Sequence, residues 1–275
     1  MSRKLILSSL IVVFIALMLT GCFYEYAGTV RHYTVDYVPG VTINLENKTG
    51  DIIINNWSQD YILVEAKIKA GAESESKAEM AVDATVVDIK KEFNNIYIKP
   101  VLPDFTYDNR VVVDFEINIP DNFNAELYTA TGDITVEECK GDLILDTSTG
   151  DITVDEALDT LMVEVGTGDV NIGYASGETN VDVSTGDIDA NLNLEAGTNN
   201  RVTTSTGDIS LILRDPSTYL VASVGTGDLN FDLNGVEMQI KEISDNTLEA
   251  IIGGTDASNL YIHTSTGNVT LKCSQ

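Results

Sequence analysis

Basic residues, histidines and cysteines are scarce in this chain. Among its 275 residues, 16 lysines and arginines stand against 43 aspartates and glutamates, which gives a net charge of -27. An acidic surface of this kind repels the phosphate backbone of nucleic acids and attracts cations or basic surfaces. The composition therefore argues against nucleic acid as a partner.

The scarcity of histidine leaves little material for acid–base or metal chemistry. Of the two histidines, His32 lies in a tyrosine-rich stretch near the N-terminus, and His263 alternates outward beside Ile262. Histidines in such places are mostly ordinary surface residues. No Ser-His-Asp order, metal-ligand cluster or phosphate-binding loop stands out in the sequence. We therefore expect a protein that is not an enzyme and that holds no cofactor.

What the sequence does contain is a repeat. Thr-Gly-Asp followed by Ile, Val or Leu starts at Thr131, Thr149, Thr167, Thr185, Thr206 and Thr226, with an early copy at Thr49 and the variant Thr-Gly-Asn-Val at Thr266. Successive starts from Thr131 are 18, 18, 18, 21, 20 and 40 residues apart. The last interval equals two periods, so we place a degenerate copy near Asp245-Asn246. A repeat of this length is typical of a solenoid.

Apolar residues alternate within each repeat, as in Leu161/Val163/Val165. A period of two is the signature of β-strands. Each repeat is therefore predicted to form two short strands joined by two turns. A left-handed hexapeptide helix also has 18-residue coils, but it needs an aliphatic residue at every sixth position, and Lys140 follows Ile134 at that offset. We therefore predict an all-β fold: a parallel, right-handed β-helix-like solenoid with coils of about 18–21 residues.

Cys139 and Cys273 fall in the first and last of the regular coils. If the coils stack in sequence order, the two residues are about seven rungs apart, or about 33 Å at roughly 4.8 Å per rung. That separation excludes a disulfide. We expect both side chains to pack as small apolar groups.

The N-terminus has the features of a prokaryotic lipoprotein signal. Ser2-Arg3-Lys4 precedes an apolar run from Leu5 to Leu19, and Leu19-Thr20-Gly21-Cys22 matches a lipobox. The match predicts cleavage before Cys22 and lipid attachment to its sulfur, which would anchor the protein on the extracytoplasmic face of the cell membrane. The alternative is an uncleaved membrane helix from Leu5 to Phe23, a stretch that is barely long enough to span.

We accordingly divide the chain into a signal peptide (1–21), a lipidated N-terminus and spacer (22–40) and a single β-solenoid domain (41–275). Residues 23–36 are predicted to form a spacer or the edge of a sheet. The interval between Thr49 and Thr131 is close to four periods, so degenerate coils or hairpins would fill it. It contains the one expected helix, Ala72 to Ala84, which we place as a cap over the N-terminal end of the solenoid.

These features resemble the putative-adhesin family of unknown function found in bacterial and archaeal envelope proteins. The resemblance covers Val41 to Leu271. It is carried by Gly50-Asp51-Ile52 with Trp57 and the strand 61–70, by 115–120, by the tandem Thr-Gly-Asp coils, and by Gly253-Gly254 with 260–269. The resemblance implies a β-solenoid and an adhesin-like role, and it supplies no catalytic residues.

Stacking the repeats places equivalent residues in columns. A glycine column is expected at constrained turns that require positive φ; it consists of Gly132, Gly150, Gly168, Gly186, Gly207 and Gly227. An aspartate column lies beside it: Asp51, Asp133, Asp151, Asp169, Asp187, Asp208 and Asp228, with Asn268 closing it.

Carboxylates stacked about 4.8 Å apart repel one another, so the aspartate column needs compensation. The side chains either accept hydrogen bonds from nearby turn amides or bind a row of calcium ions between coils. No second acid repeats in every coil to complete a calcium site, which favours the hydrogen bonds. We therefore predict no metal site.

Together, the sequence favours a lipid-anchored, extracytoplasmic β-solenoid that acts as an adhesin-like binding or structural module of the cell envelope. Its partners would be the membrane, through the lipid anchor, and a cell-surface glycan or protein. A polysaccharide-processing β-helix enzyme and an envelope sensor acting through a protein partner are the alternatives. An enzyme would need acidic and basic residues clustered in a groove that breaks the repeat.

Overall fold

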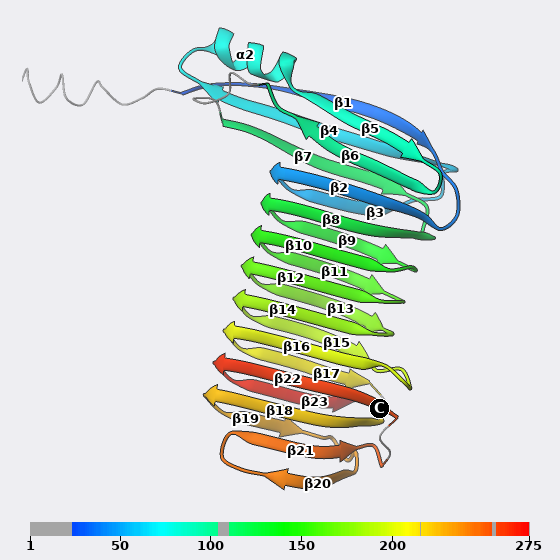
Figure 1. The fold of residues 1–275 in the computed structure, drawn as a ribbon, viewed down its shortest axis with the longest axis vertical. Helices are drawn as coiled ribbons and strands as arrows, with labels where there is room; N and C mark the ends of the chain where they lie inside the picture. Colours follow the sequence, from blue (N-terminus) through cyan, green and yellow to red (C-terminus); the bar gives the residue numbers. More distant parts are fainter. Residues whose placement is uncertain (1–23, 104–109, 215, 255–256, 275) are drawn as a thin grey trace, which may run out of the picture.

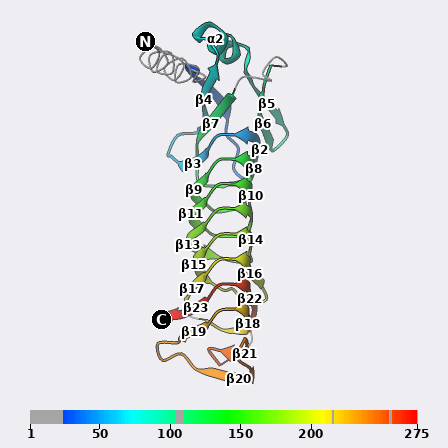
Figure 2. The ribbon, with the colours of Figure 1, turned by 90° about the vertical axis from the view of Figure 1, so that its left-hand side faces the viewer.

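The computed structural model describes residues 24–103, 110–214, 216–254 and 257–274. Within them the chain forms a tall stack of coils made of two facing sheets (Figures 1 and 2). The signal peptide 1–21 and Cys22 lie outside the described residues. Among the described residues, no helix has the length and apolar character that a membrane span requires.

The two sheets are long and mostly parallel, with one strand of every coil in each. The 11-stranded sheet has the order β1 (Glu25–Asp36), β4 (Tyr61–Ala72), β7 (Arg110–Ile119), β3 (Ile52–Asn56), β9 (Ile134–Cys139), β11 (Ile152–Ala157), β13 (Val170–Ser176), β15 (Ile188–Asn193), β17 (Ile209–Arg214), β23 (Val269–Ser274), β19 (Leu229–Asp232). The 12-stranded sheet has the order β20 (Met238–Ile243), β21 (Thr247–Ile252), β18 (Thr218–Thr226), β22 (Ser258–Thr266), β16 (Asn199–Thr206), β14 (Thr179–Thr185), β12 (Leu161–Thr167), β10 (Leu143–Thr149), β8 (Phe123–Thr131), β2 (Val41–Thr49), β6 (Asn95–Val101), β5 (Val86–Glu92).

The all-β solenoid prediction is confirmed, and the repeats stack in register. Leu143, Leu145 and Thr149 of β10 lie directly opposite Leu161, Val163 and Thr167 of β12. In Figure 1 the nearer strands run to the left and the farther strands to the right while the chain descends, so the coils are right-handed. The alternating apolar residues of both sheets face inward and form one continuous buried core from Val41 to Cys273.

The coils do not stack in sequence order, and here the sequence-based expectation is wrong. Thr266 of β22 pairs with Thr206 on one side and with Thr226 on the other. The C-terminal coil, β22 with β23, is thus inserted between the coils of β16–β17 and β18–β19. Residues 245–246 form no degenerate coil; they are the turn of the antiparallel hairpin β20–β21. Strand β20 ends the 12-stranded sheet, and the C-terminal coil occupies an interior position.

The insertion also shortens the path between the two cysteines. β9 and β23 are five positions apart in the 11-stranded sheet, so Cys139 and Cys273 are about 24 Å apart at roughly 4.8 Å per strand, not seven rungs apart. Both are buried and free. Burial raises the pKa of the Cys139 thiol to about 11, which keeps it protonated and unreactive at neutral pH.

The N-terminal end carries a separate covering layer. Thr49 pairs directly with Thr131. The interval between them supplies one degenerate coil, in which β6 and β7 pair in parallel with β2 and β3, and the antiparallel pairs β5–β6 and β4–β7. The one helix among the described residues, α2 (Glu75–Ala84), begins three residues later than predicted, behind the N-cap Ser74. It lies over β1 and β4 at this end of the molecule (Figure 1). Glu25–Asp36, within the expected spacer, forms the edge strand β1, antiparallel to β4.

Candidate functional site

The predicted glycine column lies at the corner where each coil passes from the 12-stranded to the 11-stranded sheet. Its six members have φ values from +144° at Gly227 to +150° at Gly168. A Cβ atom at Gly168 would lie 1.9 Å from the carbonyl oxygen of Gly150 in the adjacent coil. Both the backbone conformation and the close approach of neighbouring coils therefore require glycine.

The aspartate column is a hydrogen-bonded ladder that runs along the stack. Oδ1 of Asp133 accepts from the backbone N–H of Asp151 at 2.8 Å, and Oδ1 of Asp151 accepts from that of Asp169 at 2.8 Å. Each carboxylate thus binds an amide of the next coil rather than of its own turn. The order of the ladder is Asp114, Asp51, Asp133, Asp151, Asp169, Asp187, Asp208, Asn268, Asp228.

Two members of the ladder differ from the expectation. Asn268 does not close the column: it lies between Asp208 and Asp228, and its Oδ1 accepts from the Asp228 N–H at 3.0 Å. Asp114 begins the ladder, although no Thr-Gly precedes it and no motif in the sequence marks it. Among the described residues, no group of three or more His, Cys, Asp or Glu side chains is arranged to hold a metal ion.

We expect Asp169→Asn to leave stability almost unchanged or to raise it slightly. The amide oxygen still accepts the Asp187 N–H, as Asn268 does naturally in the same ladder, and one repulsive charge is removed. Asp169→Ala, which removes the acceptor, should cost about 1 kcal/mol. Urea unfolding of both variants checks this. A melting temperature that falls strongly with chelator in the wild type, and not in Asp169→Asn, would instead indicate bound calcium.

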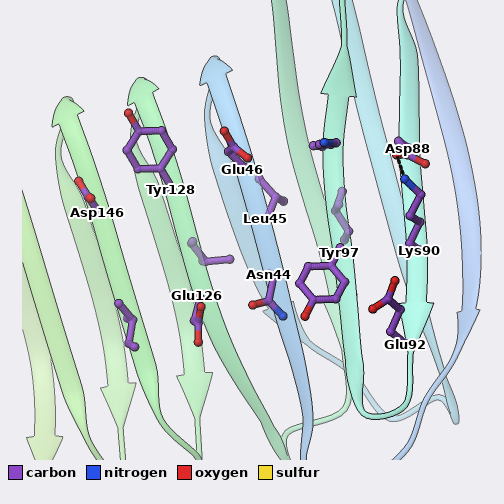
Figure 3. A pocket seen from close by; sticks show the side chains of 14 residues that line it. Asn44, Leu45, Glu46, Asp88, Lys90, Glu92, Tyr97, Glu126, Tyr128 and Asp146 are labelled. Atoms are coloured by element: carbon purple, nitrogen blue, oxygen red, sulfur yellow. Dashed lines mark hydrogen bonds and ion pairs between the residues drawn. The ribbon is translucent and has the colours of Figure 1, made fainter.

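A groove lies on the outer face of the 12-stranded sheet, across the neighbouring strands β5, β6, β2, β8 and β10 (Figure 3). Its volume is about 560 Å³. Two tyrosines, Tyr97 of β6 and Tyr128 of β8, are 43% and 37% exposed within it. We call it the tyrosine groove; its other polar side chains are Asn44, Glu46, Asp88, Lys90, Glu92, Lys99, Glu126 and Asp146.

The strand register brings acids and tyrosine together in this groove. Tyr128 is directly opposite Glu46 on one side and Asp146 on the other. Desolvation raises the pKa of Asp146, and the neighbouring negative charge of Glu164 adds to the shift. Among the described residues, Glu46, Glu126 and Asp146 form no hydrogen bond or ion pair through their carboxylates, so those oxygens are free to accept from a ligand.

The groove breaks the regularity of the solenoid. Asp88 and Lys90 of β5 form an ion pair at 2.7 Å, and the hairpin that carries them lies outside the repeat. Sequence reasoning missed this site because its walls come from strands that are distant in the sequence, and the hairpin β5–β6 lies outside the repeat. The only available signal was that acids and tyrosines occupy outward positions of 44–46 and 126–128.

The histidines lie away from the groove. His32 contacts Glu65 at 2.8 Å on the outer face of β1 and β4. Nδ1 of His263 contacts the hydroxyl of Ser223 at 2.9 Å, whereas the nearby Asp182 accepts from Thr203 instead. Within the described part of the chain, no carboxylate contacts His263, and the arrangement lacks the third member of a catalytic triad.

Residues 108–272, more than half of the chain, match the family described as Toastrack DUF4097. No curated protein matches the sequence. Among solved structures, a putative cell adhesion protein from Clostridium sporogenes is 13% identical, with a TM-score of 0.37 over 90% of this chain and 100% of that one. A putative adhesin from Bacteroides fragilis is 10% identical, with a TM-score of 0.39 over 89% and 97%. A putative lipid binding protein from Parabacteroides distasonis is 10% identical, with a TM-score of 0.33 over 90% and 97%. At such identities and TM-scores, these structures carry no argument about function.

Proposed function

Because the chain belongs to the Toastrack DUF4097 family, we propose that it is a lipid-anchored, adhesin-like binding module of the cell envelope and that the tyrosine groove is its glycan-binding site. The observation that supports this most is the pairing of two half-exposed tyrosines with free carboxylates in one groove. Aromatic faces contact the apolar C–H surfaces of sugars, and carboxylate oxygens accept from their hydroxyls. Five acids against two lysines favour a neutral or cationic glycan over a polyanion.

The chain geometry fits an anchor at Cys22. Tyr24, the first described residue, is two positions after it, so the folded domain would begin within about 7 Å of the lipid. The layer of α2, β1 and β4 would then face the membrane, and eight stacked coils would project about 38 Å outward at roughly 4.8 Å each. The tyrosine groove would lie at the membrane-proximal end of this rod.

Metabolic labelling with a fatty acid tests the anchor. We expect label on the wild-type protein, and we expect both the label and the membrane association to be lost in Cys22→Ser. A Cys139→Ser variant is the matched control, because Cys139 is buried in the core and should not affect labelling. Retention of label in Cys22→Ser would contradict lipidation at this residue.

A glycan and cell-wall binding screen tests the groove. The probe is the mature chain carrying Cys22→Ser, compared with the same chain carrying Tyr97→Ala and Tyr128→Ala. We expect the double variant to lose at least tenfold in affinity for any glycan that the parent binds, since stacking is lost on both walls. Tyr261→Ala, on the same sheet but outside the groove, is the control.

Three results of this screen would count against the proposal. Binding that survives loss of both tyrosines places the ligand elsewhere. Release of shortened glycan during incubation supports the polysaccharide-processing enzyme. Failure to bind any glycan, together with capture of a protein through the tyrosine groove, supports the sensor alternative.

A further inference from the structure

The two sheets end unequally at the end of the stack farthest from α2. The 12-stranded sheet continues past β18 with the hairpin β21–β20, whereas the 11-stranded sheet stops at β19. Figures 1 and 2 show this hairpin as the outermost layer of the molecule. We call β19, β20 and β21 the distal end. One sheet therefore overhangs the other here by two strands.

The overhang leaves part of the core uncovered. Met238, Ile240 and Ile243 are opposite Ile252, Ala250 and Leu248, which are at most 1% exposed. Directly opposed residues share a face of the sheet, so the β20 side chains point toward the interior side. Nevertheless, Ile240 is 51% exposed and Ile243 is 66% exposed. The 11-stranded sheet has no strands opposite β21 and β20 that would cover these side chains.

A cavity marks the space between the two sheets at this end. Its volume is about 310 Å³, and its apolar lining comprises Leu229, Phe231, Met238, Ile243 and Leu248. At the opposite end, α2 and the strands beside it cover the core, and Ala78, Ala81 and Val82 are buried there. The distal end has no such cover among the described residues.

Both strands that border this cavity are free on one side. Within the described chain, β19 pairs only with β23 and β20 pairs only with β21. A free edge presents unpaired N–H and C=O groups that an extended peptide can bind. A bulge between Ile240 and Glu242, and the charge of Lys241, limit indiscriminate pairing. Recognition would therefore depend on side chains as well as on the backbone.

The charge around the cavity indicates which kind of peptide fits. Asp228 and Asp245 line the cavity. Asp232, Glu237, Glu242 and Glu249 lie elsewhere in the segment 228–252, in which Lys241 is the one basic residue. A second copy of the chain would bring the same acids and be repelled, whereas basic side chains would be attracted. We propose that the distal end binds, by strand addition, an extended segment of a partner protein in which apolar residues alternate with basic ones.

Fluorescence anisotropy with a synthetic peptide tests this proposal. The probe is a labelled nonapeptide of alternating valine and lysine, titrated at physiological salt with the mature chain carrying Cys22→Ser. We expect saturable binding, weakened at least tenfold by the double substitution Ile240→Lys and Ile243→Lys, which places charge on the apolar face and repels the peptide. Ile212→Lys is the matched control, since Ile212 is 37% exposed on the outer face of β17.

A second peptide separates strand addition from simple charge attraction. It keeps the lysines but has proline in place of two valines, so that it lacks the backbone N–H donors of those two residues. We expect it to bind at least tenfold more weakly. Equal binding of the two peptides, or binding that the β20 substitutions leave unchanged, would overturn the proposal. A dimer that dissociates in the β20 double variant would do so as well, because the occupant would then be a second copy.

Discussion

Replacing Gly168 by alanine is expected to destabilise the protein by about 3 kcal/mol or more, or to prevent folding. The added Cβ would lie 1.9 Å from the Gly150 carbonyl oxygen, and that oxygen belongs to backbone held in register by the adjacent coil. The backbone at Gly168 also has a φ of +150°, which costs an L-residue further strain. The clash and the strain each contribute on the order of 1–3 kcal/mol. Urea unfolding followed by circular dichroism measures the loss.

Gly197→Ala is the matched control for this prediction. Gly197 also has a positive φ, +88°, but a Cβ there would meet nothing within 4 Å. Its substitution should therefore cost only the backbone strain, about 1 kcal/mol. The comparison isolates the contact between coils from the conformational preference of glycine. Equal losses at the two positions would show that the Gly168 corner has no close contact with its neighbour.

The second large effect is expected from Leu271→Asp. Although Leu271 is close to the C-terminus in sequence, it is fully buried in β23, between Leu211 of β17 and Phe231 of β19. An unpaired carboxylate at this position disrupts the interfaces of its coil with both neighbouring coils, since each solenoid unit contacts only the units beside it. We expect a loss of about 4 kcal/mol or more.

Leu229→Asp makes the same chemical change in the coil that ends the 11-stranded sheet. Leu229 is partly exposed and its strand has a neighbour on one side only, so a loss of about 1–2 kcal/mol is expected. If the coils stacked in sequence order, β19 would be interior and β23 terminal. The relative damage of the two substitutions would then be reversed. Urea midpoints of the two variants therefore report the order of the coils directly.

The sequence determined the unit of this fold. In a parallel stack, equivalent residues of successive coils lie directly above one another. A constant spacing along the sequence therefore produces a column of residues in the folded structure. The spacing of Thr149 and Thr167 thus predicted both the coil length and the register of β10 and β12. The glycines were predictable for a similar reason, because a turn that recurs at the same place in every coil repeats its backbone requirement.

The hydrogen-bond partner of each aspartate carboxylate could not be predicted from the sequence. The position of the carboxylate beside a turn predicted a hydrogen bond with an amide of that turn. Instead, Oδ1 of Asp151 accepts from the backbone N–H of Asp169 in the next coil. The glycines allow the coils to approach closely, and the carboxylate reaches the backbone N–H of the neighbouring coil at 2.8 Å. The tyrosine groove was not predicted because its residues are distant in the sequence. Tyr97 and Tyr128 come to lie on the same face of the sheet only when the β5–β6 hairpin folds.

The order of the coils was decided by the tertiary structure alone. Every Thr-Gly-Asp coil presents nearly the same row of backbone donors and acceptors, so the local sequence does not specify which coil pairs with which. The hairpin β20–β21 ends the sheet beyond β18, and the last coil instead pairs on both sides, with β16 and β18. Repetition of sequence therefore fixes the shape of a coil, whereas chain connectivity and the protection of sheet edges fix its place in the stack.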